Sequence, residues 1–296
     1  MTPRAVALAC GGIGWKPFRE QPVMIDLKGE LLLVGCGRMG GALLDGWLAQ
    51  GLAGEQVVIV EPNEAAHAAL EARGCRCTAD AAGLPDGFQP TLVLFAVKPQ
   101  MMDALLPDYR SFRAEGVVFL SIAAGRNIAS FERALGAGAA VVRAMPNTPA
   151  AVGRGMTVLV ANSAVDDRGR GLCGDLMRAV GEAAWIEDEA LLDAVTAVSG
   201  SGPAYVFHLV ECLASAGRGA GLPEDLAMLL ARTTVTGAGE LLHRSDDTAE
   251  RLRINVTSPA GTTEAALKVL MAEPGLGDLM ARAVEAAARR GRELAD

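Results

Sequence analysis

The sequence predicts an α/β fold, with a doubly wound sheet that has helices on both faces, followed by an all-α domain. Two observations support this prediction. Short apolar runs alternate with helix-forming segments as far as residue 186, which is the pattern of a mainly parallel sheet. Beyond residue 187 these runs stop, and helical segments broken by Gly and Pro fill the remainder. We therefore expect a sheet domain over residues 28–187 and a helical domain over residues 188–296.

The expected strands are short and continuously apolar, as is typical of strands buried on both faces of a sheet. The segment after the first strand has Leu43, Leu44 and Trp47 at helical spacing. Asn63 stands where it could cap the next helix. Strands are expected at residues 31–34, 57–60, 92–96, 117–122, 140–143, 156–160 and 183–186, and helices between them at 41–50, 64–73 and 166–179.

The first residues of the chain do not follow this pattern. Residues 1–27 have neither helix nor strand periodicity, and they lack the apolar core and cleavage site of a secretory signal. Met24 precedes the first clear strand. We interpret residues 1–27 as a disordered extension or a misassigned start, and assign no function to them.

The composition argues against several classes of partner. A net charge of −8, without a basic stripe, disfavours nucleic acid. No apolar run reaches the roughly 18 to 20 residues that a membrane span requires. The cysteines are scattered and the histidines have no neighbour at metal-ligand spacing, so we expect no metal site, and reduced thiols in a cytoplasmic protein. These residues are Cys10, Cys36, Cys75, Cys77, Cys173, Cys212, His67, His208 and His243.

A glycine-rich turn follows the first expected strand. Gly35-Cys-Gly-Arg-Met-Gly40 has the GxGxxG spacing of a dinucleotide-binding loop, in which glycines allow the tight turn and the close approach of the pyrophosphate to a helix N-terminus. Alone the motif is weak, but its place between a strand and a helix predicts a Rossmann-type domain that binds a nicotinamide dinucleotide. The predicted cofactor-binding residues of this turn are Gly35, Gly37, Arg38, Met39 and Gly40.

An acidic residue ends the second expected strand. Glu61 stands where a carboxylate binds the adenine ribose 2′-hydroxyl, and Asn63 follows it as a further candidate. A carboxylate at this place repels a 2′-phosphate, and neither Arg nor Lys lies between Glu61 and Arg73 to reverse the charge. This feature favours NADH over NADPH.

Three later strand ends should border the same crevice, because ligands bind outside the carboxyl ends of such strands. We predict cofactor contacts from Ala96, Val97 and Lys98, from Ala123, and from Asn147 as an amide partner of nicotinamide. The alternatives are that Lys98 is a solvated strand end and that Asn147 belongs to a structural turn.

The helical domain contains a loop rich in hydroxyl and amide groups. Asn255-Val-Thr-Ser-Pro-Ala-Gly-Thr-Thr263 runs into the helix-forming segment from Glu264, where a capping Ser or Thr and backbone N–H groups could hold a small carboxylate. An ordinary capped turn is the alternative. No Lys lies between Lys98 and Lys268, so lysine-assisted carbonyl chemistry is disfavoured. A protonated imine, in contrast, accepts hydride with a weak proton donor nearby.

Five ordered segments now resemble one known family, pyrroline-5-carboxylate reductase, over residues 30–293. They are Gly35-Cys-Gly-Arg-Met-Gly40, Ala96-Val-Lys-Pro-Gln100, Met145-Pro-Asn-Thr-Pro149, Ser199-Gly-Ser-Gly-Pro-Ala-Tyr205 and Val256-Thr-Ser-Pro-Ala-Gly-Thr-Thr263. The resemblance implies NAD(P)H-dependent reduction of 1-pyrroline-5-carboxylate to L-proline, the last step of proline biosynthesis. It also implies a helical domain that forms intertwined homodimers, often assembled into decamers, with active sites shared between subunits.

The same resemblance implies roles for the loop residues. The Ser258 hydroxyl and the backbone amides near Thr262 and Thr263 would hold the substrate carboxylate. Thr263 would hydrogen-bond to the ring nitrogen as its proton donor, directly or through water. The residues implied at the substrate are Asn255, which would order the loop, Ser258, Gly261, Thr262 and Thr263.

This chain departs from the family in two respects. The family usually has Gly where this chain has Ala260, and Ala fits there unless the position needs a positive φ. Many members prefer NADPH, whereas Glu61 favours NADH. Two other functions remain open: reduction of a larger cyclic imine such as piperideine carboxylate, and nucleotide sensing without catalysis.

Overall fold

The computed structural model describes residues 24–295, so most of the segment 1–27 lies outside the described residues. Within them, the chain divides into two compact units. One contains the residues up to Ala204 together with those from Ala281 onward, and the other contains Tyr205–Met280. The last helix, α11 (Leu276–Ala295), therefore contributes residues to both units.

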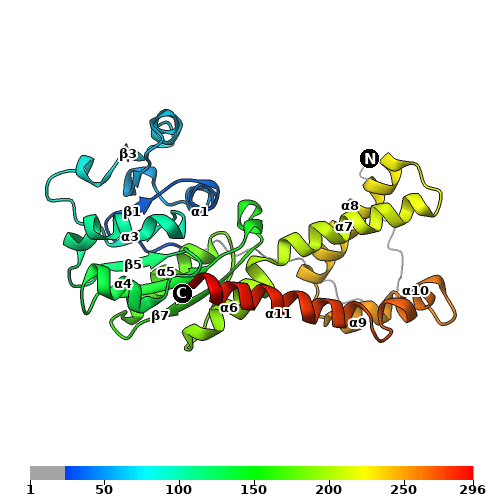
Figure 1. Cartoon of the computed structure of the whole chain (residues 1–296). Coiled ribbons are helices and arrows are strands. Elements are labelled where there is room, and N and C mark those ends of the chain that lie inside the picture. Colours follow the sequence, from blue (N-terminus) through cyan, green and yellow to red (C-terminus); the bar gives the residue numbers. More distant parts are fainter. Residues whose placement is uncertain (1–23, 296) are drawn as a thin grey trace, which may run out of the picture. The chain divides into compact units, whose positions relative to one another are not determined.

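The first unit contains an eight-stranded sheet, counted within the described residues, in the order β3-β2-β1-β4-β5-β6-β7-β8 (Figure 1). Strands β1 to β6 run parallel to one another, whereas β7 pairs antiparallel with β6. The predicted α/β doubly wound fold is confirmed. The strands are β1 (Leu31–Val34), β2 (Val57–Val60), β3 (Arg76–Thr78), β4 (Leu92–Phe95), β5 (Val118–Ser121), β6 (Ala140–Met145), β7 (Gly155–Ala161) and β8 (Gly181–Trp185).

Each face of the sheet has its own core, because successive strand residues point to opposite faces. On one face, Leu31 and Leu33 pack with α1 (Arg38–Ala49) and α5 (Asp167–Arg178). The indole of Trp47 is fully buried there, and its N–H donates to the Leu176 carbonyl at 2.8 Å. The opposite face packs against α3 (Met102–Leu105) and α4 (Ile128–Leu135), with clustered aromatic rings from Phe95, Tyr109, Phe119 and Phe131.

Three details differ from the sequence prediction. The short edge strand β3 was not predicted, because its residues are only partly buried and form no apolar run. The helix expected over 64–73 is a 3₁₀ turn, η2 (Glu64–Ala66), followed by α2 (His67–Glu71). Asn63 precedes that turn but does not cap it with its side chain, so the capping prediction was wrong.

A short helical connection leaves the sheet. It consists of η7 (Glu189–Leu191), α6 (Leu192–Val195) and a π-helical segment, η8 (Thr196–Gly200). The helices that follow it are α7 (Gly202–Gly219), α8 (Glu224–Arg244), α9 (Ala249–Asn255), α10 (Thr262–Leu270) and α11. The predicted domain boundary near residue 187 stays a prediction, since the compact unit with the sheet extends to Ala204.

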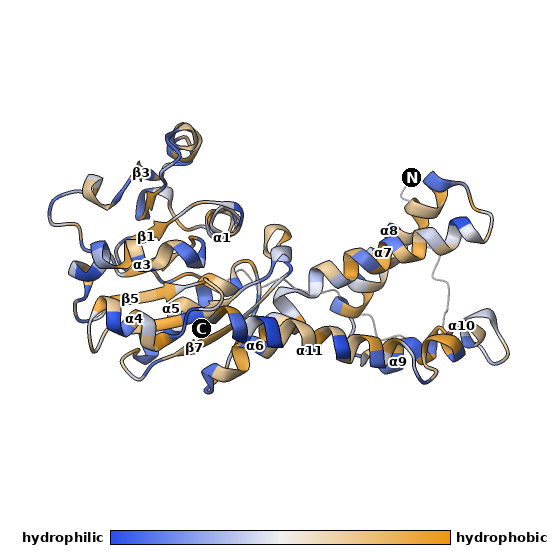
Figure 2. Ribbon diagram, viewed as in Figure 1, coloured by the Kyte–Doolittle hydropathy of each residue, from blue (hydrophilic) through white to orange (hydrophobic). Residues whose placement is uncertain are grey.

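The helices of the helical unit carry many apolar residues (Figure 2). Many of their large apolar side chains are exposed in the single chain. These include Phe207 of α7, Leu229 of α8 and Val269 of α10. Large apolar side chains exposed in such number on one unit are typical of a surface that associates with another protein surface. Among the residues that the structure describes, no helix is long and apolar enough to cross a membrane.

Candidate dinucleotide and substrate sites

The predicted cofactor residues lie at one edge of the sheet. Strands β1, β2, β4, β5 and β6 are parallel, so their carboxyl ends meet at the same edge, where doubly wound sheets bind ligands. The candidates that follow these strands in turn are Gly35, Gly37, Arg38, Met39 and Gly40, then Glu61 and Asn63, then Ala96, Val97 and Lys98, then Ala123, and finally Asn147.

The three glycines of the loop have different constraints. Gly35 has φ +87°, and a Cβ there would lie 2.7 Å from Val97 Cγ1. A Cβ on Gly40 would lie 2.5 Å from the Gly35 carbonyl oxygen. Gly37, at the N-cap of α1, would meet nothing within 4 Å. The chain itself requires Gly35 and Gly40, whereas the open space at Gly37 fits a pyrophosphate that approaches the backbone closely.

This difference makes Gly37→Ala an informative variant. Since Ala fits at Gly37 in the chain, we expect the thermal midpoint to change little, while the Kd for NADH rises at least about tenfold because the methyl group occupies the pyrophosphate position. Gly35→Ala is the matched contrast, because it should lower the midpoint itself. Calorimetry for binding and thermal unfolding separate the two effects. Unchanged affinity in Gly37→Ala would contradict this assignment.

Glu61 is held by the backbone on both sides. Its carboxylate accepts hydrogen bonds from the Cys36 N–H at 2.8 Å and from the Asn63 N–H at 3.0 Å. These contacts place a negative charge between the glycine loop and the end of β2. Burial, followed by the charge of Glu61, raises the pKa of Cys36 to about 11, so this thiol within the loop stays neutral near pH 7.

Asn147 connects two of the segments that the sequence singled out. Its Oδ1 accepts from the Met156 N–H at 2.8 Å, and its Nδ2 donates to the carbonyl and hydroxyl oxygens of Ser199, each at 3.2 Å. The amide therefore ties the end of β6 to the π-helical segment η8. A contact of Asn147 with nicotinamide stays a prediction.

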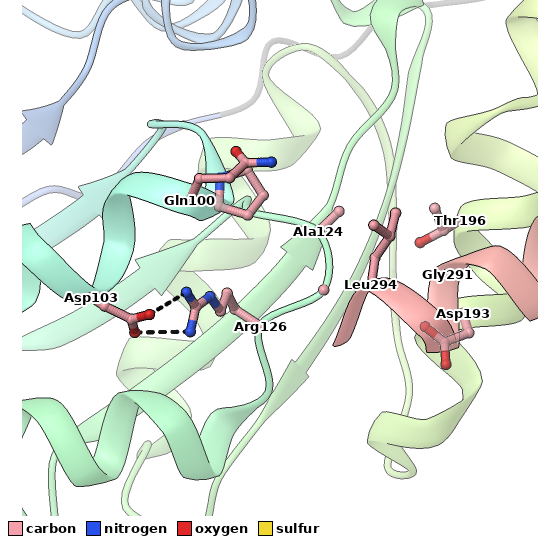
Figure 3. A pocket seen from close by; sticks show the side chains of 10 residues that line it. Gln100, Asp103, Ala124, Arg126, Asp193, Thr196, Gly291 and Leu294 are labelled. Carbon is pink, nitrogen blue, oxygen red and sulfur yellow. Dashed lines mark hydrogen bonds and ion pairs between the residues drawn. The ribbon is translucent and has the colours of Figure 1, made fainter. Parts of the chain in front are cut away.

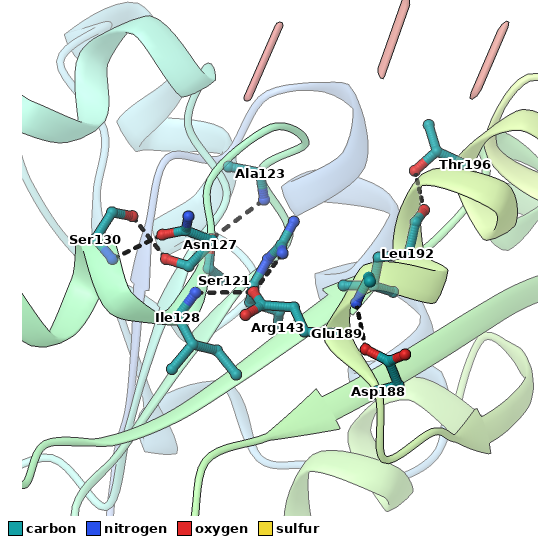
Figure 4. Close-up of polar contacts among 11 residues, drawn as sticks. Ser121, Ala123, Asn127, Ile128, Ser130, Arg143, Asp188, Glu189, Leu192 and Thr196 are labelled. Atoms are coloured by element: carbon teal, nitrogen blue, oxygen red, sulfur yellow. Dashed lines mark hydrogen bonds and ion pairs between the residues drawn. The ribbon is translucent and has the colours of Figure 1, made fainter. Parts of the chain in front are cut away.

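Arg143 and Glu189 form a partly buried ion pair (Figure 4), which sequence reasoning missed. Arg143 lies on β6 and is only 8% exposed. Its guanidinium donates a hydrogen bond to Oε1 of Glu189 at 2.5 Å. The same oxygen accepts the N–H of Ile128, the first residue of α4, at 2.8 Å. Glu189 thus joins β6, α4 and the start of the helical connection. An arginine within an otherwise apolar strand was the available signal.

A cavity of about 370 Å³ lies beside the ends of β4 and β5 (Figure 3). Pro99, Ala124 and Thr196 contribute to its lining, together with Gly291 and Leu294 of α11. Arg126 and Asp103, also at the cavity, pair through two hydrogen bonds of 2.8 and 2.5 Å. Both strand ends are those that the sequence assigned to the cofactor crevice.

The predicted substrate loop joins α9 to α10. The N-cap of α10 is Gly261, and no side chain caps this end, so the prediction of a Ser or Thr cap was wrong. Thr262 and Thr263 are instead the first two helical residues. Uncapped N–H groups at a helix start are suited to an anion. This loop therefore retains the donors that a carboxylate needs.

Other contacts determine the shape of the loop. Thr257 Oγ1 donates to the Arg253 carbonyl at 2.6 Å, and the Gly261 N–H donates to the Ser258 carbonyl at 3.0 Å. Ala260 has φ +57°, the conformation that favours glycine. Asn255 is exposed in the single chain, and its predicted role in ordering the loop stays a prediction.

Comparison with known proteins decides the family. The chain is 38% identical over 271 residues to pyrroline-5-carboxylate reductase of Pseudomonas aeruginosa, covering 90% of this chain and 97% of that protein. The chain belongs to the pyrroline-5-carboxylate reductase family. Residues 189–294 match the family model described as pyrroline-5-carboxylate reductase dimerisation, and residues 30–125 match the model described as NADP oxidoreductase coenzyme F420-dependent.

Two solved structures agree with this assignment. A pyrroline-5-carboxylate reductase from Coxiella burnetii has a TM-score of 0.85 at 33% identity and covers 90% of this chain and 99% of its own. Pyrroline carboxylate reductase of Plasmodium falciparum with NADP bound has a TM-score of 0.76 at 27% identity, with 92% and 100% covered. The exposed apolar helices of this family member lie within the matched dimerisation region.

Proposed function

We propose that this chain reduces 1-pyrroline-5-carboxylate to L-proline with a hydride from NAD(P)H, in the last step of proline biosynthesis. The observation that carries the proposal is the uncapped start of α10, with hydroxyl groups beside it, in a chain whose other unit holds a dinucleotide loop. The loop supplies neutral donors for a carboxylate, and no lysine is needed for an acceptor that is already an imine.

Different residues of the loop bind the substrate carboxylate and donate the proton. Ser258 and the backbone N–H groups of Thr262 and Thr263 hold the substrate carboxylate. A Cβ at Gly261 would lie 3.0 Å from the Ser258 carbonyl oxygen, so glycine permits the close turn that aims these amides. The Thr263 hydroxyl hydrogen-bonds to the ring nitrogen and gives it a proton, directly or through water, and solvent water restores the proton to the hydroxyl. NAD(P)H, when bound, supplies the hydride.

The cofactor preference follows from the charge at the end of β2. Glu61 is fixed by two backbone N–H groups, and its carboxylate favours the free ribose hydroxyls of NADH over the 2′-phosphate of NADPH. NADPH, which many family members prefer, is the alternative cofactor.

The assembly is part of the proposal. The exposed apolar faces of the helical unit form a homodimer, with active sites shared between subunits, and dimers assemble into decamers. The predicted cytoplasmic location stays a prediction.

The direct test follows nicotinamide absorbance with 1-pyrroline-5-carboxylate, using NADH and NADPH in parallel. We expect turnover with both and a kcat/KM at least about tenfold higher with NADH, because the carboxylate of Glu61 repels a 2′-phosphate. Glu61→Ser should reduce this ratio, and Glu64→Ser, one turn further along, is the control. Preference for NADPH in the unaltered protein would contradict the role of Glu61.

The same assay separates the rival functions. Piperideine carboxylate presents the same carboxylate on a larger ring, so preferential turnover of that substrate would move the assignment to larger imines. Nucleotide binding without turnover of any cyclic imine would favour a sensing role.

A further inference from the structure

The substrate loop contains an unusual backbone conformation. Among the residues that the structure describes, Ala260 is the one non-glycine residue with a positive φ, at +57°. A side chain with a Cβ disfavours this conformation, so neighbouring interactions must maintain it. Ala260 lies between Ser258 and Gly261, and a change in its backbone would alter the direction of both.

The carboxylate of Glu264 supplies such an interaction. Glu264 is the third residue of α10, and its Oε2 accepts the Ala260 N–H at 2.5 Å. A glutamate at this helical position commonly reaches back to the N-cap amide. Here the N-cap amide, that of Gly261, donates to the Ser258 carbonyl, and Glu264 reaches one residue further back.

Lys268 completes the arrangement. Its Nζ lies 2.9 Å from Oε1 of Glu264, one helical turn along α10. The Lys268 side chain, followed by the Ala260 N–H, lowers the pKa of Glu264, so the carboxylate is charged at neutral pH. The ammonium group offsets this charge, which would otherwise oppose an anion at the start of α10.

We propose that Glu264 is a positioning residue for the substrate: its carboxylate holds Ala260 in the left-handed conformation and so aims the Ser258–Thr263 loop at the substrate carboxylate. This inference rests on the proposed function of that loop. Glu264 itself does not touch the substrate. Its effect therefore depends on the residue at position 260, because glycine adopts the same φ without strain.

A double-mutant cycle tests this dependence. Glu264→Ala should raise the KM for 1-pyrroline-5-carboxylate about tenfold, with kcat and the Kd for NADH within about twofold, because loss of the acceptor lets Ala260 relax. In the Ala260→Gly background the same substitution should change KM by no more than about twofold. An equal effect in both backgrounds would overturn the proposal.

Two further variants test whether the effect comes from the hydrogen bond that Glu264 accepts or from its charge. Glu264→Gln keeps an oxygen acceptor and should keep KM within about threefold of the unaltered enzyme. A KM as high as that of Glu264→Ala would assign the effect to charge and overturn the role of the hydrogen bond. Glu250→Ala removes an exposed carboxylate from the first turn of the preceding helix and should leave KM unchanged.

Hydrogen–deuterium exchange separates failure of this inference from failure of the proposed function. A peptide that contains Ala260 should exchange faster in Glu264→Ala but not in Glu250→Ala, and this result requires no turnover. If deuterium exchange of this peptide is unchanged in Glu264→Ala, or if exchange becomes faster while KM stays the same, the inference is wrong. Absence of turnover in the unaltered protein would contradict the function alone.

Discussion

Replacing Thr263 by alanine is expected to lower kcat about a hundredfold, the lower end of what loss of a positioned proton donor costs. The Kd for NADH should stay within about twofold, because the predicted cofactor residues lie at the sheet edge. Thr263 is the second residue of α10 and does not cap it, and alanine is a good helix former, so the fold should not change. Pre-steady-state and steady-state kinetics with 1-pyrroline-5-carboxylate would measure the effect.

Thr263→Ser is the matched control for the hydroxyl. This variant keeps the hydroxyl group that donates the proton, so its kcat should lie within about fivefold of that of the unaltered enzyme. If Thr263→Ala turns over at the original rate, Thr263 has no catalytic role, and water alone protonates the ring nitrogen. If Thr263→Ser is as slow as Thr263→Ala, the methyl group rather than the hydroxyl matters.

The second large effect is expected at Glu189. Glu189→Ala should lower the free energy of unfolding by about 3 kcal/mol, which is the low end of the range for breaking a buried ion pair. The low end applies because the Glu189 side chain is still 30% exposed. The substitution leaves the Arg143 guanidinium buried without its carboxylate, and it removes the acceptor of the Ile128 N–H. Denaturant unfolding at fixed protein concentration, followed by tryptophan fluorescence, would measure the loss.

Glu187→Ala is the control for this variant. The Glu187 side chain is 85% exposed and lies 3.7 Å from Arg170, so its removal should change stability by less than about 0.5 kcal/mol. Equal losses of unfolding free energy in the two variants would show that the Arg143–Glu189 pair stabilises the fold no more than an exposed pair does. Measurable kcat in Glu189→Ala at low temperature would confirm that the pair stabilises the fold and takes no part in the chemistry.

The dinucleotide-binding domain could be predicted because its signals are local. An apolar run, a turn with Gly35, Gly37 and Gly40, and a helix follow one another within a short stretch of chain, and Glu61 ends the next strand. The parallel sheet then brings such strand ends to one edge whatever the loops contain. The predicted substrate loop was likewise visible as a run of hydroxyl and amide groups before a helix.

The missed features depend on contacts between distant parts of the chain or on backbone conformation. Arg143 and Glu189 are 46 positions apart, and nothing near either residue indicates the other. The pairing of β3 at the edge comes from its hydrogen bonds to β2 rather than from an apolar pattern. Glu264 is a partial exception, because a glutamate three residues after a helix start is a recognised capping signal.

The sequence alone indicated most strands of the sheet, the glycine-rich turn between the first strand and helix, and the family, because strand burial, glycine geometry and helix periodicity are properties of neighbouring residues. Only the tertiary structure decided which carboxylates hold the backbone: Glu61 at the glycine loop, Glu189 at α4 and Glu264 at Ala260. A carboxylate can accept from any N–H within reach, and the folded chain sets which N–H that is.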